Sequence, residues 1–347
     1  MIRIALLGAG NFVRDEHLPA IQACDVFDLK AVYSRSQASA QAVASEAKSP
    51  VDIYYDSPEM QGVSLEDLLQ RKDISAVIVC LPIIIQPDVI RKAIEAGKHV
   101  LSEKPIAKDL ATGVSLLDWY RSQSNPPIWS VAENFRFIKP LEYGAEKLRE
   151  IGGQVVTFRS NFYTLIKDDD KYFNTEWRKV PQYQGGFLLD GGVHFVAGLR
   201  YMLAAVGEDI KYLAAFTSLQ KKKLPPVDTL HGVAKTQNGA GILCLSYGTE
   251  YKSGVELEVV TDNGSVTWNG PTVTITMKSS SGEKAEQSKD FSYDSGVTAE
   301  VAAFGHSINA GKADPRQTPI EALKDLEALQ KLLLSGESNG HVQSVEL

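Results

Sequence analysis

Asp190 and His194 are the pair of side chains whose types and spacing best suit acid–base chemistry. Histidine titrates near neutral pH, so it can give or take a proton during a reaction. If the chain from Gly191 onward is helical, residues four apart share a face, with Cβ atoms about 6 Å apart. Asp190 could then orient the His194 imidazole or bind a substrate hydroxyl. The competing explanation is structural: Asp190 caps the helix and His194 packs in the core.

A glycine loop, Gly8-Ala9-Gly10, follows directly after the apolar run Ile4 to Leu7. Glycines between a strand and a helix let the backbone turn sharply and approach a pyrophosphate. We therefore expect these glycines, with Asn11 and Phe12, to bind a dinucleotide. Val13 stands where the motif has its third small residue, which predicts a shifted helix start or looser packing of the helix.

The residues after the second expected strand indicate which dinucleotide binds. NAD sites place an acidic residue there for the ribose 2′-hydroxyl, whereas this chain has Ser34 and Arg35. A guanidinium can bind a 2′-phosphate and a hydroxyl can donate to it, so we expect NADP. The alternative is that Arg35 is a solvated residue and Ser36 caps the next helix.

Short apolar runs alternate with amphipathic stretches over the first 125 or so residues. This alternation predicts a doubly wound parallel sheet with helices on both faces, a Rossmann domain. The expected strands are 4–7, 29–33, 76–81 and 99–102, and the expected helices are 17–23, 36–47, 65–69 and 86–96.

The pattern changes at Ser124-Asn125-Pro126-Pro127, which we interpret as a linker between domains 1–124 and 125–347. Beyond it, apolar and polar residues alternate, as in an open antiparallel sheet, so the chain is predicted to be α/β throughout. The expected strands are 155–162, 239–247, 255–261 and 272–278, with a solvated hairpin tip at 278–289 and flanking helices at 298–310 and 319–334.

Three further motifs carry a resemblance to a known family. They are the run Ala96 to Pro105 (AGKHVLSEKP), the pair Trp177-Arg178, and the run Gly185 to His194 (GGFLLDGGVH). With the glycine loop, they resemble the glucose–fructose oxidoreductase / inositol dehydrogenase (Gfo/Idh/MocA) family. The chain is also similar to fungal NADP-linked members of that family.

The resemblance implies a Rossmann domain followed by an α/β domain whose open sheet forms dimers or tetramers through its outer face. It implies that Lys104 lies near both nicotinamide and substrate, beside Glu103 at the cofactor. It also implies that Asp190 and His194 enter the site from the second domain. Trp177 and Arg178 are expected on a loop near cofactor and substrate.

One run departs from the family. Many members have Thr-Pro-Asn-x-x-His after the fourth strand, and this chain has Leu81-Pro82-Ile83-Ile84-Ile85-Gln86. Leu81, Pro82 and Gln86 are still expected along the cofactor. The wall they form is more apolar than in relatives that act on polar sugars.

Carbonyl reduction needs a proton donor and a group that stabilises the developing alkoxide. We expect Lys104 to polarise the carbonyl and His194 or Lys104 to transfer the proton. Tyr163, on an expected strand, and Trp177, as an apolar wall, are candidate substrate contacts. The polar residues Glu133, Asn134 and Arg136 are weaker candidates for lining the cleft.

The composition limits the partners of the protein. Its 347 residues favour two domains, and 43 acidic against 36 basic residues give a net charge of −7. Such a surface repels polyanions, so no nucleic-acid partner is expected. No apolar run reaches the roughly 18 residues of a membrane span, so we expect no membrane partner and a cytoplasmic location. Cys24, Cys80 and Cys244 lack metal-ligand spacing, so no metal site is expected.

Together these features predict an enzyme that transfers hydride between NADP(H) and a small carbonyl or alcohol, such as a sugar, polyol, diol or aldehyde. The alternative is a non-catalytic NADP-binding regulator, because a fold alone does not establish activity. Retention of Lys104, Asp190 and His194 together favours the enzyme. A third hypothesis, reduction of a conjugated double bond, follows from the apolar stretch Ile83 to Ile85.

Overall fold

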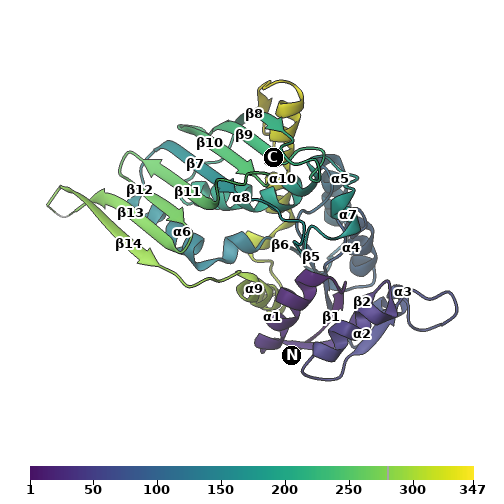
Figure 1. Cartoon of the computed structure of the whole chain (residues 1–347). Helices are drawn as coiled ribbons and strands as arrows, with labels where there is room; N and C mark the ends of the chain where they lie inside the picture. Colours follow the sequence, from purple (N-terminus) through teal and green to yellow (C-terminus); the bar gives the residue numbers. More distant parts are fainter. Residues whose placement is uncertain (280) are drawn as a thin grey trace. The chain divides into compact units, whose positions relative to one another are not determined.

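The computed structural model describes residues 1–279 and 281–347, and the chain forms two compact units (Figure 1). Unit 1 consists of Met1–Glu133 and Val297–Leu323. Unit 2 consists of Asn134–Gly296 and Lys324–Leu347. Both units are therefore discontinuous in sequence. Within the described residues, no helix combines the length and the apolar character that a membrane crossing requires.

Unit 1 contains a six-stranded sheet whose neighbouring strands are all parallel, in the order β3-β2-β1-β4-β5-β6. The order reverses between β1 and β4, and α/β sheets bind ligands outside the carboxyl ends of their strands at such a point. The predicted Rossmann fold is confirmed. The strands are β1 (Ile2–Leu7), β2 (Phe27–Ser34), β3 (Asp52–Tyr55), β4 (Ala76–Val79), β5 (His99–Glu103) and β6 (Trp129–Ala132).

The helices of this unit follow the predicted alternation with strands. Ser36 caps α2, as the sequence allowed, because its Oγ accepts the Ser39 N–H. Ser64 starts α3 through a capping box with Asp67, which was not predicted from the sequence. The helical segments are η1 (Val13–His17), α1 (Leu18–Ala23), α2 (Gln37–Glu46), α3 (Leu65–Leu69), α4 (Gln86–Glu95), α5 (Leu110–Ser122), α9 (Val297–Ala310) and η3 (Pro315–Gln317).

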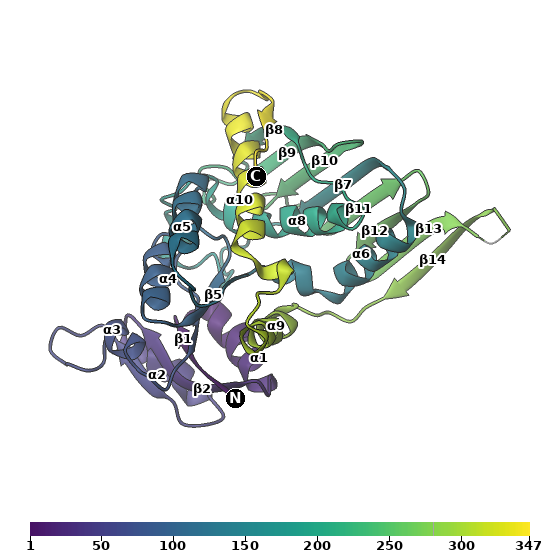
Figure 2. The same cartoon turned by 180° about the vertical axis from the view of Figure 1, so that it is seen from behind.

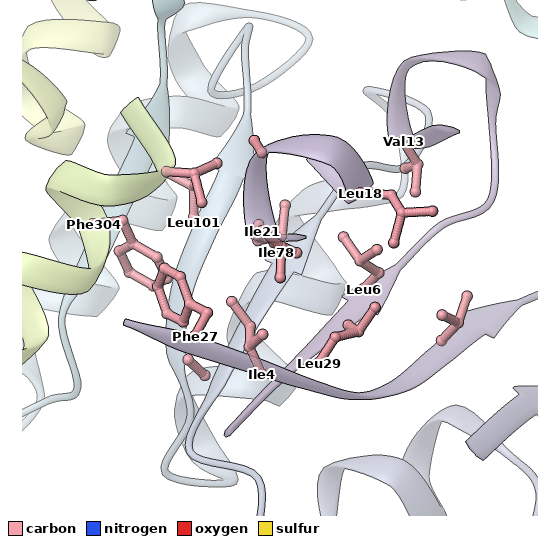
Figure 3. Close-up of a cluster of buried hydrophobic side chains, with 14 of the residues drawn as sticks. Ile4, Leu6, Val13, Leu18, Ile21, Phe27, Leu29, Ile78, Leu101 and Phe304 are labelled. Carbon is pink, nitrogen blue, oxygen red and sulfur yellow. The ribbon is translucent and has the colours of Figure 1, made fainter. Parts of the chain in front are cut away.

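Helix α9 corrects one expectation. We expected it to flank the antiparallel sheet, but it packs against α1 in unit 1. Phe304 stacks on Phe27 of β2, with ring centroids 6.0 Å apart, inside the buried cluster drawn in Figure 3. Sequence periodicity shows that a helix has an apolar face, but it does not show which sheet that face covers.

Unit 2 contains a nine-stranded sheet in the order β14-β13-β12-β11-β7-β10-β9-β8-β15. Neighbours are antiparallel except β7 and β10, which are parallel. The predicted open, mostly antiparallel sheet is confirmed. The strands are β7 (Val155–Tyr163), β8 (Tyr212–Ser218), β9 (Thr229–Lys235), β10 (Ala240–Ser246), β11 (Gly254–Thr261), β12 (Gly264–Asn269), β13 (Thr272–Lys278), β14 (Lys284–Asp290) and β15 (Gln343–Ser344).

Two long helices, α6 (Lys139–Ile151) and α8 (Gly186–Ala204), lie on one face of this sheet (Figure 2). Phe162 of β7 stacks on Phe195 of α8 at 4.2 Å, which identifies the covered face. The other helical segments are η2 (Asn134–Phe137), α7 (Glu176–Lys179) and α10 (Pro319–Glu337). The expected hairpin tip at 278–289 is solvated, but it was placed too widely, because Lys284–Asp290 forms strand β14 and pairs with β13. Residue 280 lies outside the described residues.

The boundary between units differs from the expected one at 124/125. The strand Trp129–Ala132 follows the linker-like residues but pairs in parallel with β5, so unit 1 continues to Glu133. The prolines of the linker lie between α5 and β6, inside unit 1. Residues Val297–Leu323 then return to unit 1, which a pass along the sequence does not reveal.

A buried ion-pair cluster joins η2, α8 and α10 within unit 2. Asp325 accepts two 2.7 Å bonds from Arg136 and one of 2.6 Å from Arg200. Arg136 is 3% exposed and Asp325 is 1% exposed. Arg136 was expected to line the cleft, and the structure corrects this because its guanidinium is committed to Asp325. Glu133 is also buried, and Asn134 donates to the Ser295 carbonyl.

We expect Asp325→Ala to lower the free energy of unfolding by about 3–5 kcal/mol, because it removes the carboxylate that two buried guanidiniums share. Urea denaturation followed by circular dichroism measures the change. Asp168→Ala is the matched control, since Asp168 is 94% exposed and pairs with Lys223 at the surface. It should leave stability nearly unchanged, and an equally small effect of Asp325→Ala would contradict the role of the cluster.

Candidate active site

The glycine loop has the geometry of a cofactor cradle. Gly8 has φ +127°, and a Cβ there would overlap the carbonyl oxygen of Cys80 at the end of β4. Its N–H donates to the Tyr33 carbonyl at 2.8 Å, so the loop is fixed between the ends of two neighbouring strands. A Cβ on Gly10 would meet nothing within 4 Å. Space is therefore left beside the backbone at Gly10, as a pyrophosphate requires.

The helix after this loop begins with a π-helical turn, η1. The Leu18 N–H bonds to the Val13 carbonyl, five residues back, and Val13 is buried. Of the two outcomes expected from Val13, the structure therefore shows the altered helix start and not looser packing. Asn11 and Phe12 lie between Gly10 and this turn, at the helix end where a phosphate binds.

Ser34 ends β2, and Arg35 follows it as an exposed residue before α2. A second charge lies in the same region, because the Tyr33 hydroxyl donates to Asp56 at 2.8 Å. Burial and Asp56 raise the pKa of Tyr33, while the charge of Arg35 opposes the shift. The guanidinium of Arg35 and the carboxylate of Asp56 therefore both lie near the end of β2.

The residues of the run after β4 differ in exposure. Ile83 is buried, while Ile84 and Ile85 are partly exposed. Leu81 and Pro82 are half-buried next to them. Gln86 begins α4 and is 1% exposed, and its Oε1 has no hydrogen-bond partner among the described residues. The exposed surface of this run is therefore apolar, and the side-chain oxygen of Gln86 is buried without a hydrogen-bond partner among the described residues.

Glu103 ends β5, and its carboxylate contacts both His17 and the Lys104 backbone. Its Oε1 lies 2.6 Å from Nε2 of His17, and its Oε2 accepts the Lys104 N–H at 3.2 Å. Glu103 and His17 are buried, and Lys104 is half-buried. Cys80 lies close by, since one possible ligand atom from each of His17, Cys80 and Glu103 lies within 4.8 Å of the others.

This group of three is the main feature that the sequence did not reveal. His17 was visible near the glycine loop, but nothing in the sequence linked it to Glu103, 86 positions away. The link follows from the sheet order, which places β4 between β1 and β5 and brings their carboxyl ends together.

In unit 2, Asp190 and His194 both lie on α8, as their spacing predicted. The helix begins at Gly186 after Gly185, whose φ is +78°, so Asp190 lies in the second turn and is not a cap. The imidazole of His194 stacks on Phe135, with ring centroids 4.8 Å apart and planes at 17°. His194 is half-buried, so its ring has a fixed orientation and retains some access.

Arg178 binds Asp190 within unit 2. Its Nε donates to Asp190 Oδ2 at 2.7 Å, and its guanidinium lies 4.0 Å from the centroid of the Trp177 ring. Trp177 is thus the platform for an Arg178–Asp190 ion pair. The structure describes a role for both residues of the Trp177-Arg178 motif within unit 2.

Two tyrosines beside this pair were not expected. Burial and the charge of Asp190 raise the pKa of Tyr183 and of Tyr247. A Cβ on Gly191 would overlap the Tyr247 hydroxyl, so this glycine lets the tyrosine approach α8 closely. The sequence signal was Gly191, the first glycine of the pair Gly191-Gly192.

Tyr163 corrects a further expectation. Side chains on β7 alternate, and Phe162 faces α8, so Tyr163 faces the opposite side of the sheet. There it interacts with Cys244, and Lys252 lies 4.1 Å from the centroid of its ring. A substrate contact beside Asp190 and His194 is therefore ruled out for Tyr163 by the pleat of the strand.

The candidate residues thus form two groups. The glycine loop, Ser34–Arg35 and Lys104 lie at the carboxyl ends of the parallel strands of unit 1. The Arg178–Asp190 pair and His194 lie on or beside α8 in unit 2. The first group fits a dinucleotide, and the second offers an imidazole and a carboxylate held in place by a guanidinium.

Comparisons with known proteins agree with this division. Residues 2–129 match the NAD-binding Rossmann fold of an oxidoreductase family, and residues 148–344 match the C-terminal alpha/beta domain of the same family. The chain is 51% identical over 347 residues to the dehydrogenase FPY6 of Fusarium mangiferae, covering 100% of this chain and 99% of that protein.

Two solved structures extend the likeness. The oxidoreductase TM0312 of Thermotoga maritima superposes with a TM-score of 0.85 at 27% identity, covering 99% of this chain and 98% of that one. The 3-ketoreductase KijD10 of Actinomadura kijaniata, in complex with NADP and TDP-benzene, has a TM-score of 0.77 at 20% identity, covering 96% and 97%. The chain therefore belongs to the Gfo/Idh/MocA family of NAD(P)-dependent oxidoreductases.

Proposed function

We propose that this oxidoreductase uses NADP(H) and transfers hydride between the nicotinamide and a small carbonyl or alcohol, such as a sugar, polyol, diol or aldehyde. The observation that carries the proposal is the fixed backbone of Lys104. Its N–H is bound by Glu103 at the end of β5, in the same unit as the glycine loop. A half-buried ammonium group at the carboxyl end of the sheet can stabilise a developing alkoxide.

Each side chain then has a distinct task. The bound cofactor supplies or accepts the hydride. In the reducing direction, Lys104 stabilises the negative charge that develops on the carbonyl oxygen. His194 donates the proton to that oxygen, and its ring is oriented by Phe135. Asp190, held by Arg178, accepts a hydrogen bond from a second hydroxyl of the substrate.

We expect Lys104→Ala to lower turnover with NADPH by about 10²–10⁴-fold, the range for loss of a positioned catalytic group. Cofactor affinity should stay within roughly tenfold, because the glycine loop is unchanged. NADPH fluorescence titration and NADPH oxidation against a panel of aldehydes, sugars and diketones measure the two effects.

Lys108→Ala is the matched control, because Lys108 is a lysine four residues further on whose side chain is 42% exposed. Wild-type turnover in the Lys104 variant would remove this residue from the mechanism. Tight NADPH binding by the wild type without turnover on any substrate would instead favour the non-catalytic regulator.

The preference for NADP rests on Arg35 and Ser34 at the end of β2. We expect Arg35→Glu to weaken NADPH binding by about 10–100-fold, since a hydrogen bond to a charged group contributes about 1.5–3 kcal/mol. NADH binding should change little. The control is Arg121→Glu, which makes the same charge change at an exposed position of α5. An unchanged ratio of NADPH to NADH affinity would show that another group binds the 2′-phosphate.

We further propose a homodimer or homotetramer formed through the face of the nine-stranded sheet opposite α8. Support comes from apolar side chains exposed there: Phe216 is 66% exposed and Val233 is 55% exposed. Ile242 lies directly beside Val233 in the register of β9 and β10 and is partly exposed. Contiguous exposed apolar groups of this kind mark association surfaces.

Val233→Glu should therefore shift the protein to monomers in sedimentation-velocity runs, because each copy would bring a charge into the interface. Val342→Glu, at an exposed valine outside the long strands of the sheet, should leave the assembly intact. A wild-type protein that sediments as a monomer would contradict the proposed assembly.

A further inference from the structure

His17 is a buried titratable residue that the proposed reaction does not use. Its side chain is completely buried, and its Nε2 lies 2.6 Å from Glu103 Oε1. Buried carboxylates are costly unless charged or polar donors pair with them. The His17–Glu103 contact therefore supplies the partner that the buried Glu103 carboxylate needs, and it fixes both side chains within unit 1.

One carboxylate connects His17 to Lys104. Oε1 of Glu103 contacts the imidazole, while Oε2 accepts the backbone N–H of Lys104 at 3.2 Å. Rotation of the Glu103 side chain would break both contacts. The position of the Lys104 backbone thus depends on a carboxylate whose orientation is set by His17.

The other end of this connection is anchored beside the glycine loop. His17 is the last residue of the π-helical turn η1, which starts three residues after Gly10. Phe12 packs edge-on against the imidazole, with ring centroids 5.2 Å apart and planes at 78°. The ring is held by the segment that begins the phosphate-binding helix.

The hydrogen-bond direction can be assigned from the opposite ring nitrogen. Nδ1 of His17 is buried and has no hydrogen-bond partner among the described residues. A proton on Nδ1 would be a buried donor without an acceptor, which is costly. The ring proton therefore belongs on Nε2, from which it is donated to Glu103.

We propose that His17 is a positioning residue for Lys104, acting through Glu103. This inference rests on the proposed function, in which Lys104 stabilises the developing alkoxide. His17 contacts neither substrate nor the reacting atoms. It keeps the Glu103 carboxylate turned toward Lys104, and it couples the start of the phosphate-binding helix to the position of the catalytic lysine.

The test compares two substitutions of His17 in the full-length protein. His17→Phe keeps a ring but removes the donor, and we expect kcat to fall by about 10–100-fold, as expected for misplacement of a catalytic group. The Kd for NADPH should change by less than about threefold. His17→Gln puts an N–H near the position of Nε2 and should restore most of kcat.

A kinetic isotope effect separates positioning from general damage. With NADPH deuterated at C4, the primary isotope effect on kcat should increase in His17→Phe, because hydride transfer becomes slower relative to the other steps. His99→Phe is the control: His99 is a partly buried histidine at the opposite end of β5 and accepts the Ile128 N–H. It should reduce stability without changing the isotope effect.

Three outcomes decide the matter. Loss of turnover in both Lys104→Ala and His17→Phe, with recovery in His17→Gln, supports the proposal. Wild-type kcat in His17→Phe, with an inactive Lys104→Ala, overturns the positioning role and leaves the proposed function intact. Wild-type kcat in Lys104→Ala overturns the proposed function itself.

Measuring the zinc content of the purified protein tests the alternative that His17, Cys80 and Glu103 bind a metal ion. His, Cys and Glu side chains are all zinc ligands, and Cys80 completes a group of three. Stoichiometric zinc in the purified protein that is lost in Cys80→Ser would overturn the proposal, because Nε2 or Glu103 would then bind the metal. Metal-free protein with full turnover supports the hydrogen-bonded pair.

Discussion

The close approach of Gly8 to the end of β4 is the constraint on which the rest of unit 1 depends. Any side chain at this position would collide with the Cys80 carbonyl, so the chain can leave β1 only through glycine. Because the loop is fixed there, the following helix starts within a few residues and with a π-helical turn. That turn places His17 at the carboxyl end of the sheet, where Glu103 ends β5 and Lys104 follows it.

In unit 2, the candidate acid–base residues are held in place by helix packing and an ion pair. Its acid–base candidates lie on one long helix whose first turns are rich in glycine, so aromatic side chains such as Tyr247 can approach the helix backbone. Asp190 is paired with Arg178, and Arg178 in turn lies over Trp177. A carboxylate bound in this way has a fixed orientation, so little of its order has to be created when a substrate arrives.

The sequence predicted the elements well and their partners poorly. The glycine loop, the apolar strands and the i, i+4 spacing of Asp190 and His194 are local signals, and the structure has the elements that they indicate. The His17–Glu103 contact, the Arg178–Asp190 pair and the return of α9 to unit 1 join residues far apart in sequence or on different elements. Periodicity carries no information about such pairings. Tyr163 shows the same limit within a strand, because an error of one residue exchanges the two faces.

The return of α9 to unit 1 has a consequence for the order in which the protein folds during synthesis. The six-stranded sheet is complete at Ala132, but Phe304, Val301 and Val297 of its core emerge much later. At typical rates of synthesis, the interval between these segments lasts roughly 10–30 s. Throughout that time the apolar side of α1 and Phe27 lack their cover. The nascent N-terminal half therefore exposes apolar surface during synthesis, and unit 1 reaches its native packing only when almost the whole chain has left the ribosome.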